Sequence, residues 1–158
     1  MVTMVIKVTM VTQILCDTVC VWGLYFRDSA FREHVLELRK SNLLLVPEIC
    51  LVEAAYPIYR AKGLRELRNY SEFVEHLPLS RNIKLLPLTL ENLAQALRLA
   101  AEHSSYFVDE EGNLNLYDAI LAATWEEFRA PLATADSKLL SYGRALGLEC
   151  VELRRTRK

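Results

Sequence analysis

Four acidic residues occupy positions from which they could do chemistry together, although they are far apart in the sequence. Asp17 ends the strand-like run VTQILCD, and Asp136 ends the similar run PLATAD. Glu53 lies inside PEICLVEAAYP, and Asp118 lies at the start of the small-residue segment YDAILAAT. In a parallel α/β sheet the carboxyl ends of neighbouring strands share one edge, so side chains from distant segments meet there. We therefore expect these four carboxylates to gather at that edge.

Gathered carboxylates need a compensating positive charge. Two of them about 4 Å apart repel each other by roughly 4 kcal/mol at an effective dielectric constant near 20. The usual partner of an all-oxygen ligand set is Mg²⁺ or Mn²⁺, so we predict that cofactor. Thr18 and Thr134 are candidates for supporting hydrogen bonds, although Thr18 fits ordinary turn chemistry equally well. Two of the acids also have structural explanations. Asp136 could be a helix N-cap, and Asp118 could lie in the first turn of a helix, where a negative charge is favourable.

Length and composition describe one ordinary domain, with residues 1–158 as a single unit. The chain has 158 residues, of which 52% are hydrophobic, enough for a sizeable core. Its net charge of −1 excludes a global basic field for nucleic acid, so any RNA contact must come from local patches. Two clusters of cationic residues could contact RNA, and the alternative is that both are ordinary solvent-exposed charges. They are Arg60, Lys62, Arg65 and Arg68 on one predicted helix, and Arg154, Arg155, Arg157 and Lys158 at the chain end.

The amino-terminal segment and the cysteines bear on the cellular context. The uncharged stretch from Val8 to Cys16 is too short to cross a bilayer, and its β-branched residues favour a buried strand. We therefore expect a cytoplasmic protein without a membrane segment. Cys16 and Cys20 are four residues apart, which is not the spacing of a redox or zinc pair. Cys16, Cys50 and Cys150 lie in apolar surroundings that suit small core residues, and a structural disulfide is the alternative.

Apolar strand-like segments alternate with amphipathic helical ones, which predicts an α/β fold with a parallel sheet covered by helices on both faces. The predicted strands are residues 11–16, 43–46, 82–86, 132–134 and 148–153. The predicted helices begin after a cap at Asp28 or Ser29 and then span 47–63, 64–77, 90–103, 118–128 and 137–146, with a loop over 104–115. The helix pair over residues 48–77 has no strand between its members, and we expect it to project as a clip. Pro57 predicts a kink inside it and Gly63 a stop.

The order of the acidic motifs resembles that of the PIN-domain ribonucleases, in particular the VapC-type toxins of toxin–antitoxin pairs. The matching pieces are ILCDTVCVW, VPEICLVEAAYP, LYDAILAAT and LATADSKL, and the resemblance runs from about Thr12 to Leu153. It implies a single PIN-like domain whose five-stranded parallel sheet has the order 3-2-1-4-5. It also implies hydrolysis of RNA phosphodiester bonds that depends on Mg²⁺ or Mn²⁺ and leaves 5′-phosphate and 3′-hydroxyl ends.

The resemblance also implies roles for the acids and partners for the chain. Asp17, Asp118 and Asp136 would bind one or two metal ions, and Glu53 would bind directly or through water. Membership of this family implies an RNA substrate, a homodimer and a small protein antitoxin that inserts residues near the acids. Val19 is a departure, because these proteins often have Asn or Ser at that position. Apolar residues on the clip would serve such interfaces or else close the core; they are Tyr56, Ile58, Tyr59 and Leu67.

Other functions have weaker support from the residues. A phosphoacceptor receiver domain needs paired acids after the first strand and a late lysine near them, whereas Lys138 lies on the wrong side of its strand. A haloacid-dehalogenase-like phosphatase needs D-x-D, whereas this chain has Asp17, Thr18 and Val19. A catalytically weak PIN-fold binding module and an RNA-maturation nuclease stay open as alternatives. Histidine catalysis is not expected, because all three histidines fall in predicted surface helices.

Overall fold

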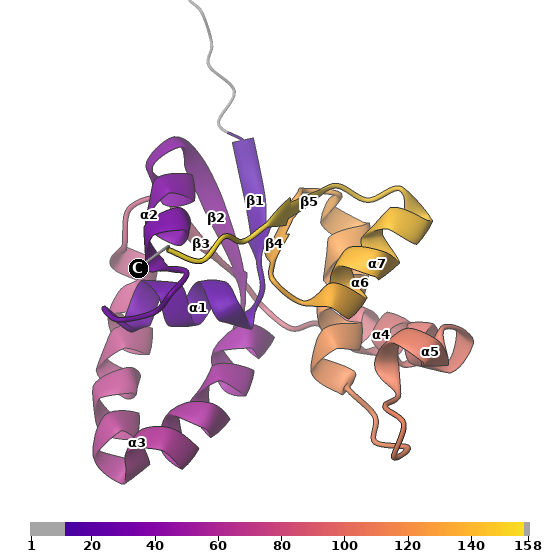
Figure 1. Cartoon of the computed structure of the whole chain (residues 1–158), viewed down its shortest axis with the longest axis horizontal. Helices are drawn as coiled ribbons and strands as arrows, with labels where there is room; N and C mark the ends of the chain where they lie inside the picture. Colours follow the sequence, from indigo (N-terminus) through magenta and orange to yellow (C-terminus); the bar gives the residue numbers. More distant parts are fainter. Residues whose placement is uncertain (1–11, 157–158) are drawn as a thin grey trace, which may run out of the picture.

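The computed structural model describes residues 12–156 and shows a five-stranded parallel sheet (Figure 1). Its strands are β1 (Thr12–Cys16), β2 (Asn42–Pro47), β3 (Ile83–Leu86), β4 (Leu132–Thr134) and β5 (Cys150–Glu152). They lie in the order β3-β2-β1-β4-β5 with every neighbouring pair parallel, which confirms the predicted sheet. The predicted strand start at Val11, the stretch that begins at Val8, and the cationic Arg157 and Lys158 lie outside the described residues.

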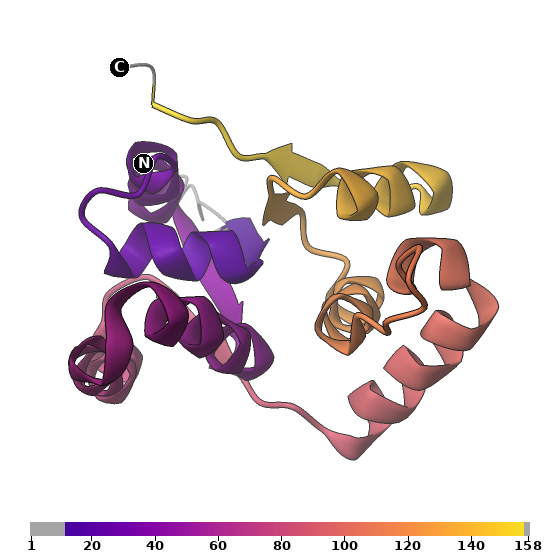
Figure 2. The same ribbon diagram turned by 60° about the horizontal axis from the view of Figure 1, so that its bottom comes forward.

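The helices connect the strands in two groups, one on either side of the molecule (Figures 1 and 2). The first group is α1 (Thr18–Tyr25), α2 (Arg32–Ser41) and α3 (Glu48–His76), followed by the 3-10 helix η1 (Leu77–Leu79). The second is α4 (Leu90–Glu102), α5 (Ser104–Phe107), α6 (Leu116–Phe128) and α7 (Ser137–Leu146). The chain leaves β1 toward β2 and later crosses to β4 on the other side of β1. Crossover connections between parallel strands are right-handed. The connections that run from β1 toward β3 and those that run toward β5 therefore place their helices on opposite faces of the sheet.

The core lies on both faces of the central strands, which are therefore apolar without alternation. Residues 14–16 of β1 and 44–46 of β2 are all buried. Below the other half of the sheet, Trp125 of α6 and Tyr142 of α7 fill the interior with ring centroids 6.5 Å apart. Gly143 follows Tyr142, and a Cβ atom there would lie 2.2 Å from the Trp125 ring. The close approach of α7 to α6 therefore depends on the missing side chain.

The predicted clip is the long helix α3, and its change of direction falls at Gly63. That residue has φ 78° and ψ −169°, whereas the backbone stays helical through Pro57. Glycine adopts such a positive φ without the steric cost that a Cβ atom brings. The backbone therefore keeps helical angles at Pro57, where the sequence predicts a kink, and breaks at Gly63, where the sequence predicts a stop. The second arm folds back along the first, because the Tyr70 hydroxyl donates a hydrogen bond to the carbonyl of Leu51 at 2.8 Å (Figure 1).

Some local predictions need correction. The helix α2 begins at Arg32, with Phe31 at its N-cap and not Asp28 or Ser29, although the Ser29 hydroxyl accepts a hydrogen bond from the amide of Phe31 at 3.3 Å. The helix α6 begins two residues before Asp118. The predicted loop over 104–115 contains α5. The helix α1 is missing from the sequence prediction altogether, although it carries much of the site.

Several interpretations that the sequence leaves open are settled by burial. Ile58 lies in the core and Leu67 packs against it, whereas Tyr56 and Tyr59 are exposed on the clip. All four cysteines carry free thiols, and three of them are buried, so the disulfide alternative is wrong. No helix within residues 12–156 is both long enough and apolar enough to span a membrane.

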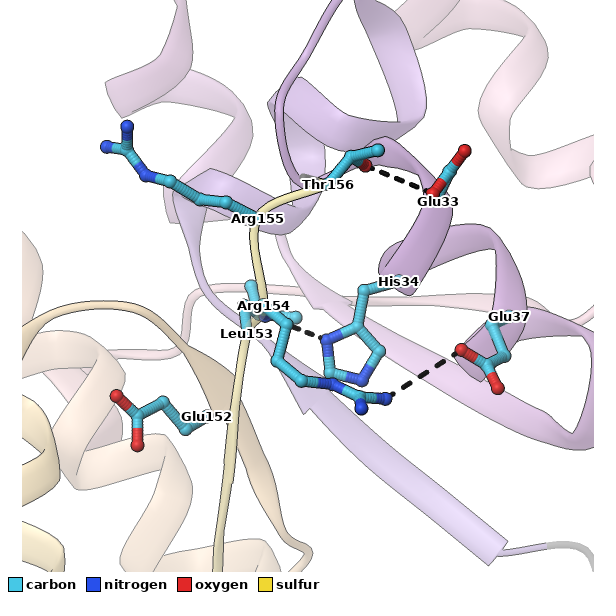
Figure 3. Close-up of a pocket in the computed structure, with 8 residues that line it drawn as sticks. All are labelled: Glu33, His34, Glu37, Glu152, Leu153, Arg154, Arg155 and Thr156. Carbon is cyan, nitrogen blue, oxygen red and sulfur yellow. Dashed lines mark hydrogen bonds and ion pairs between the residues drawn. The ribbon is translucent and has the colours of Figure 1, made fainter. Parts of the chain in front are cut away.

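Beyond β5 the chain lies across α2 and closes a surface pocket there (Figure 3). The amide of Arg154 donates to Nδ1 of His34 at 2.9 Å, and the amide of Thr156 donates to the carbonyl of Ala30 at 2.7 Å. Burial and the charge of Arg154 lower the pKa of His34, which suits an unprotonated acceptor nitrogen. These contacts anchor the end of the chain. None of the four candidate acids lines the pocket, so the pocket is separate from the predicted active site.

Candidate active site

Asp17 lies at the carboxyl end of β1, where the central strand meets β4. Its Oδ1 accepts hydrogen bonds from the amides of Val19 (2.8 Å) and Cys20 (3.4 Å), so the residue is the N-cap of α1. Its Oδ2 accepts a hydrogen bond from the Thr134 hydroxyl at the end of β4. Asp17 is only 4% exposed. The Val19 side chain packs against the core, so that residue supplies only its amide to the site.

Thr134 connects the acid of β1 to the acid that follows β4. The Thr134 hydroxyl donates to Asp17 and accepts a hydrogen bond from the amide of Asp136 at 3.0 Å. Asp136 in turn is the N-cap of α7, because its Oδ1 accepts from the amide of Leu139 at 2.9 Å. The predicted hydrogen bond of Thr134 within the acid cluster and the predicted capping role of Asp136 are both confirmed.

Glu53 comes from the second turn of α3. Thr18, the first residue of α1, donates its hydroxyl to Oε2 of Glu53. Thr18 is buried and Glu53 is half-buried, and α1 packs against α3. The predicted contact between Thr18 and a carboxylate is therefore confirmed, and it ties the clip to the start of α1.

Asp118 lies in the first turn of α6 and forms a closed pair with Asn115. The Oδ1 of Asn115 accepts from the amide of Asp118 at 3.2 Å, and its Nδ2 donates to Oδ2 of Asp118 at 2.7 Å. Asn115 thus caps α6 and fixes the carboxylate at the same time. The sequence prediction missed this residue, although an Asn three positions before an acid is a signal for a capped helix start.

The four acids share one electrostatic environment. Burial, opposed by the hydroxyl and amide donors, raises the pKa of Asp17 to about 6, with a further contribution from Glu53. Burial and the charges of Asp136, Glu53 and Asp17 raise the pKa of Asp118 to about 7, while Lys138 acts to lower it. Burial and the charge of Asp136 also raise the pKa of Glu53. Each of the four acids therefore lies within electrostatic reach of at least one other, and their gathering around one metal ion stays a prediction.

The donor set fits a hard divalent cation, because every group is a carboxylate or hydroxyl oxygen. One oxygen of Glu53, one of Asp118 and one of Asp136 accepts no hydrogen bond from the part of the chain that the structure describes. Within residues 12–156, the single ion pair joins Arg154 to Glu37, so no arginine or lysine neutralises these acids directly. Among the same residues, no three His, Cys, Asp or Glu side chains stand close enough together to hold one ion.

The predicted cationic patch on the clip divides into separate parts. Arg60, Lys62, Arg65 and Arg68 are all exposed. Lys62 lines an apolar hollow beside Trp22 of α1, and the break at Gly63 separates the first two residues from the last two. Arg60 lies seven residues after Glu53 and hence on the same side of α3. Any contact between this patch and RNA stays a prediction.

Comparison with known proteins agrees with this architecture. The chain matches the PIN domain family over residues 14–145. It is similar in structure to VapC20 of Mycobacterium tuberculosis, a toxin that cleaves the sarcin–ricin loop, with 19% identity, a TM-score of 0.63, and 89% of this chain and 98% of that one covered. VapBC2 of Rickettsia felis, bound to a promoter DNA fragment, has 17% identity, a TM-score of 0.60 and coverage of 90% and 99%.

A toxin–antitoxin complex from Klebsiella pneumoniae has 17% identity, a TM-score of 0.55, and coverage of 90% of this chain and 98% of that one. No curated protein sequence matches the chain. At these identities the structural likeness shows the fold, whereas the family match spans most of the chain. On that ground the chain belongs to the PIN domain family.

Proposed function

We propose that this chain is an endoribonuclease that depends on a divalent metal ion and acts as the toxin of a toxin–antitoxin pair. The observation that carries this proposal is that Asp17, Glu53, Asp118 and Asp136 come from four separate elements and lie within electrostatic reach of one another. A buried carboxylate is normally paired, and buried Asp17 receives hydroxyl and amide donors from the described residues but no ion pair. Burial, with a smaller contribution from neighbouring carboxylates, raises the pKa values of Asp17 and Asp118, and a divalent cation would stabilise their ionised forms.

Each acid has a distinct part in the proposed reaction. A bound Mg²⁺ or Mn²⁺ would lower the pKa of a water ligand and stabilise negative charge on the RNA phosphate. Asp17, Asp118 and Asp136 would hold the ion, and the hydrogen bond from the Thr134 hydroxyl fixes the Asp17 carboxylate. Glu53 would bind the ion directly or through water, and its Oε1, which accepts no hydrogen bond within residues 12–156, would be available to orient or deprotonate the attacking water. Asp118 must lose its proton first, so binding of the ion should release protons near neutral pH.

The choice of RNA and of a toxin rests on similarity. The solved structures named above include a toxin that cleaves the sarcin–ricin loop and a toxin–antitoxin complex. By analogy we propose an RNA substrate, a homodimer and a small protein antitoxin for this chain. Co-purification with the product of a neighbouring short reading frame, followed by inhibition of cleavage by that product, would test the partner.

A metal titration combined with a cleavage assay tests the nuclease proposal. Structured and unstructured RNAs are incubated with the wild type, with Asp118→Asn and with Asp28→Asn, which changes an exposed aspartate away from the acids. We expect cleavage that needs Mg²⁺ or Mn²⁺, is abolished by EDTA and by Asp118→Asn, and is unchanged in Asp28→Asn. Wild-type cleavage by Asp118→Asn would refute the catalytic assignment. Metal binding without cleavage of any RNA would instead identify a PIN-fold binding module.

A further inference from the structure

Two tyrosines border the acid cluster where α3 and α6 come together. Tyr56 lies three residues after Glu53, on the next turn of the same side of α3. Tyr117 immediately precedes Asp118 in α6. The two rings contact each other across the junction of the helices, with centroids 6.4 Å apart and planes inclined at 57°. Each aromatic residue is thus the neighbour of a proposed catalytic carboxylate.

The Tyr56–Tyr117 pair has an open aromatic face. Tyr56 is 59% exposed, so burial in the core does not explain a ring of this size at that position. Figure 1 shows the first arm of α3 and the start of α6 side by side below the carboxyl ends of the strands.

We propose that the Tyr56–Tyr117 pair is a stacking platform for an unpaired nucleobase next to the scissile phosphate of a single-stranded RNA. This inference rests on the proposed ribonuclease function. Nucleobases of single strands stack on exposed aromatic side chains, and this contact tolerates any sequence because every base has a π-face. Bases inside a duplex present no free face. The platform therefore selects single-stranded or looped RNA.

One cationic residue is placed to extend this platform along the RNA backbone. Arg60 lies four residues after Tyr56 and is exposed, so the two side chains are neighbours on one side of α3. Lys62 lies about half a helical turn from Arg60, on the opposite side of α3, and lines the hollow beside Trp22. The structure thus favours Arg60 over Lys62 as the contact to the next phosphate.

Tyr59 provides a matched control for Tyr56. It is 53% exposed on the same arm of α3, which is close to the exposure of Tyr56. Within residues 12–156 its ring makes no aromatic contact, and it lies on a side of the helix turned further from Glu53. A difference between the two alanine variants therefore reports position beside the acids and not the loss of an exposed tyrosine.

The test measures RNA binding by the full chain in Mg²⁺, with every variant carrying Asp118→Asn to prevent cleavage. The probes are a fluorescein-labelled 12-nucleotide RNA of randomised sequence and a perfect duplex of the same length, followed by anisotropy. We expect Tyr56→Ala to weaken single-strand binding by about 5- to 150-fold, the range for loss of one stacked base. We expect Tyr56→Phe, which keeps the ring face, and Tyr59→Ala to stay within about twofold of the background, and the duplex to respond equally little.

A second readout reports stacking itself. A single 2-aminopurine placed in the strand should lose fluorescence on binding to the background protein and to Tyr56→Phe, but not to Tyr56→Ala. The platform is refuted if Tyr56→Ala binds the single strand as well as Tyr59→Ala, if the duplex loses as much affinity, or if no single-stranded RNA binds. Cleavage by the wild type is scored separately, so absence of cleavage with Tyr56-dependent binding would reject the nuclease and retain the platform.

Discussion

Replacing Asp118 by Asn should stabilise the protein in the absence of metal, while abolishing its activity. The side chain keeps its shape, and its amide oxygen can still accept the hydrogen bond from Asn115. What disappears is a negative charge that burial and the charges of Asp136, Glu53 and Asp17 oppose. A structural acid would behave in the opposite way, because its removal would cost a favourable interaction.

The size of the effect follows from the pKa of Asp118, which is raised from 3.8 to about 7. Each pKa unit corresponds to about 1.4 kcal/mol, so the ionised form is disfavoured by at most about 4 kcal/mol. Relaxation of the side chain and access of water reduce this figure, and we expect a gain of about 1–2 kcal/mol. For a domain of this size that corresponds to a rise in Tm of about 2–8 °C.

The gain should depend on pH with a definite sign. A carboxyl group whose pKa is higher in the folded than in the unfolded protein binds its proton more tightly when folded. Wild-type stability therefore falls as the pH rises from about 4 to about 7, and the penalty is complete above that pH. At pH 8 in EDTA the variant should melt above the wild type, and at pH 5 the difference should shrink, since wild-type Asp118 is then largely neutral.

Thermal melts at the two pH values, with and without Mg²⁺, provide the measurement. Adding Mg²⁺ at pH 8 should reverse the ranking, because an ion that binds only the folded state stabilises the wild type more than the variant that has lost a ligand. Asp28→Asn serves as the control, with equal melts expected under all conditions. An Asp118→Asn variant that is no more stable than the wild type at pH 8 in EDTA, or equally stabilised at pH 5, would refute the reasoning.

Three further outcomes follow from contacts in the structure. Thr134→Val removes the hydroxyl that donates to buried Asp17. We expect the free energy of unfolding at pH 7, measured by urea titration, to fall by about 1–3 kcal/mol. An unchanged urea midpoint would contradict the hydrogen bond. Gly143→Ala drives a methyl group into Trp125 and should cost about 1–3 kcal/mol in the same assay, with a neutral result excluding the close packing. In the native protein a thiol reagent should modify Cys150 first, because the other three cysteines are buried, and all four should react in denaturant without a reductant.

The sheet, and the positions of Asp17 and Asp136 after their strands, could be predicted because both depend on patterns that act over several residues. Apolar runs mark buried parallel strands, and the alternation with helices brings the carboxyl ends of the strands to one edge. The helix α1 could not be found in the same way. Its sequence TVCVWGLY is apolar on every side, so a buried helix of this kind leaves no period to detect.

Other features depend on single backbone angles or side-chain rotamers, which no sequence pattern encodes. The clip turns at Gly63 although Pro57 is the stronger helix breaker, because the proline occupies a helical position and the glycine supplies a positive φ. The pairing of Asn115 with Asp118 is equally local. Sequence position therefore indicated which acids come near each other. The orientation of each carboxylate depends on local hydrogen bonds that only the structure shows.

The structural roles of these acids, which the sequence leaves as alternatives to metal binding, are present in the fold and are compatible with the proposed metal site. Asp17 and Asp136 are N-caps of α1 and α7, and Asp118 lies in the first turn of α6, so three helix starts converge on the site. Backbone amides at a helix start favour negative charge, which offsets part of the repulsion that burial creates. Removing either cap sacrifices a hydrogen bond to the backbone as well as a charge, at a cost of about 1 kcal/mol. Asp118 is capped by Asn115 and caps nothing itself, so it is the one aspartate of the three whose neutralisation isolates the electrostatics of the site.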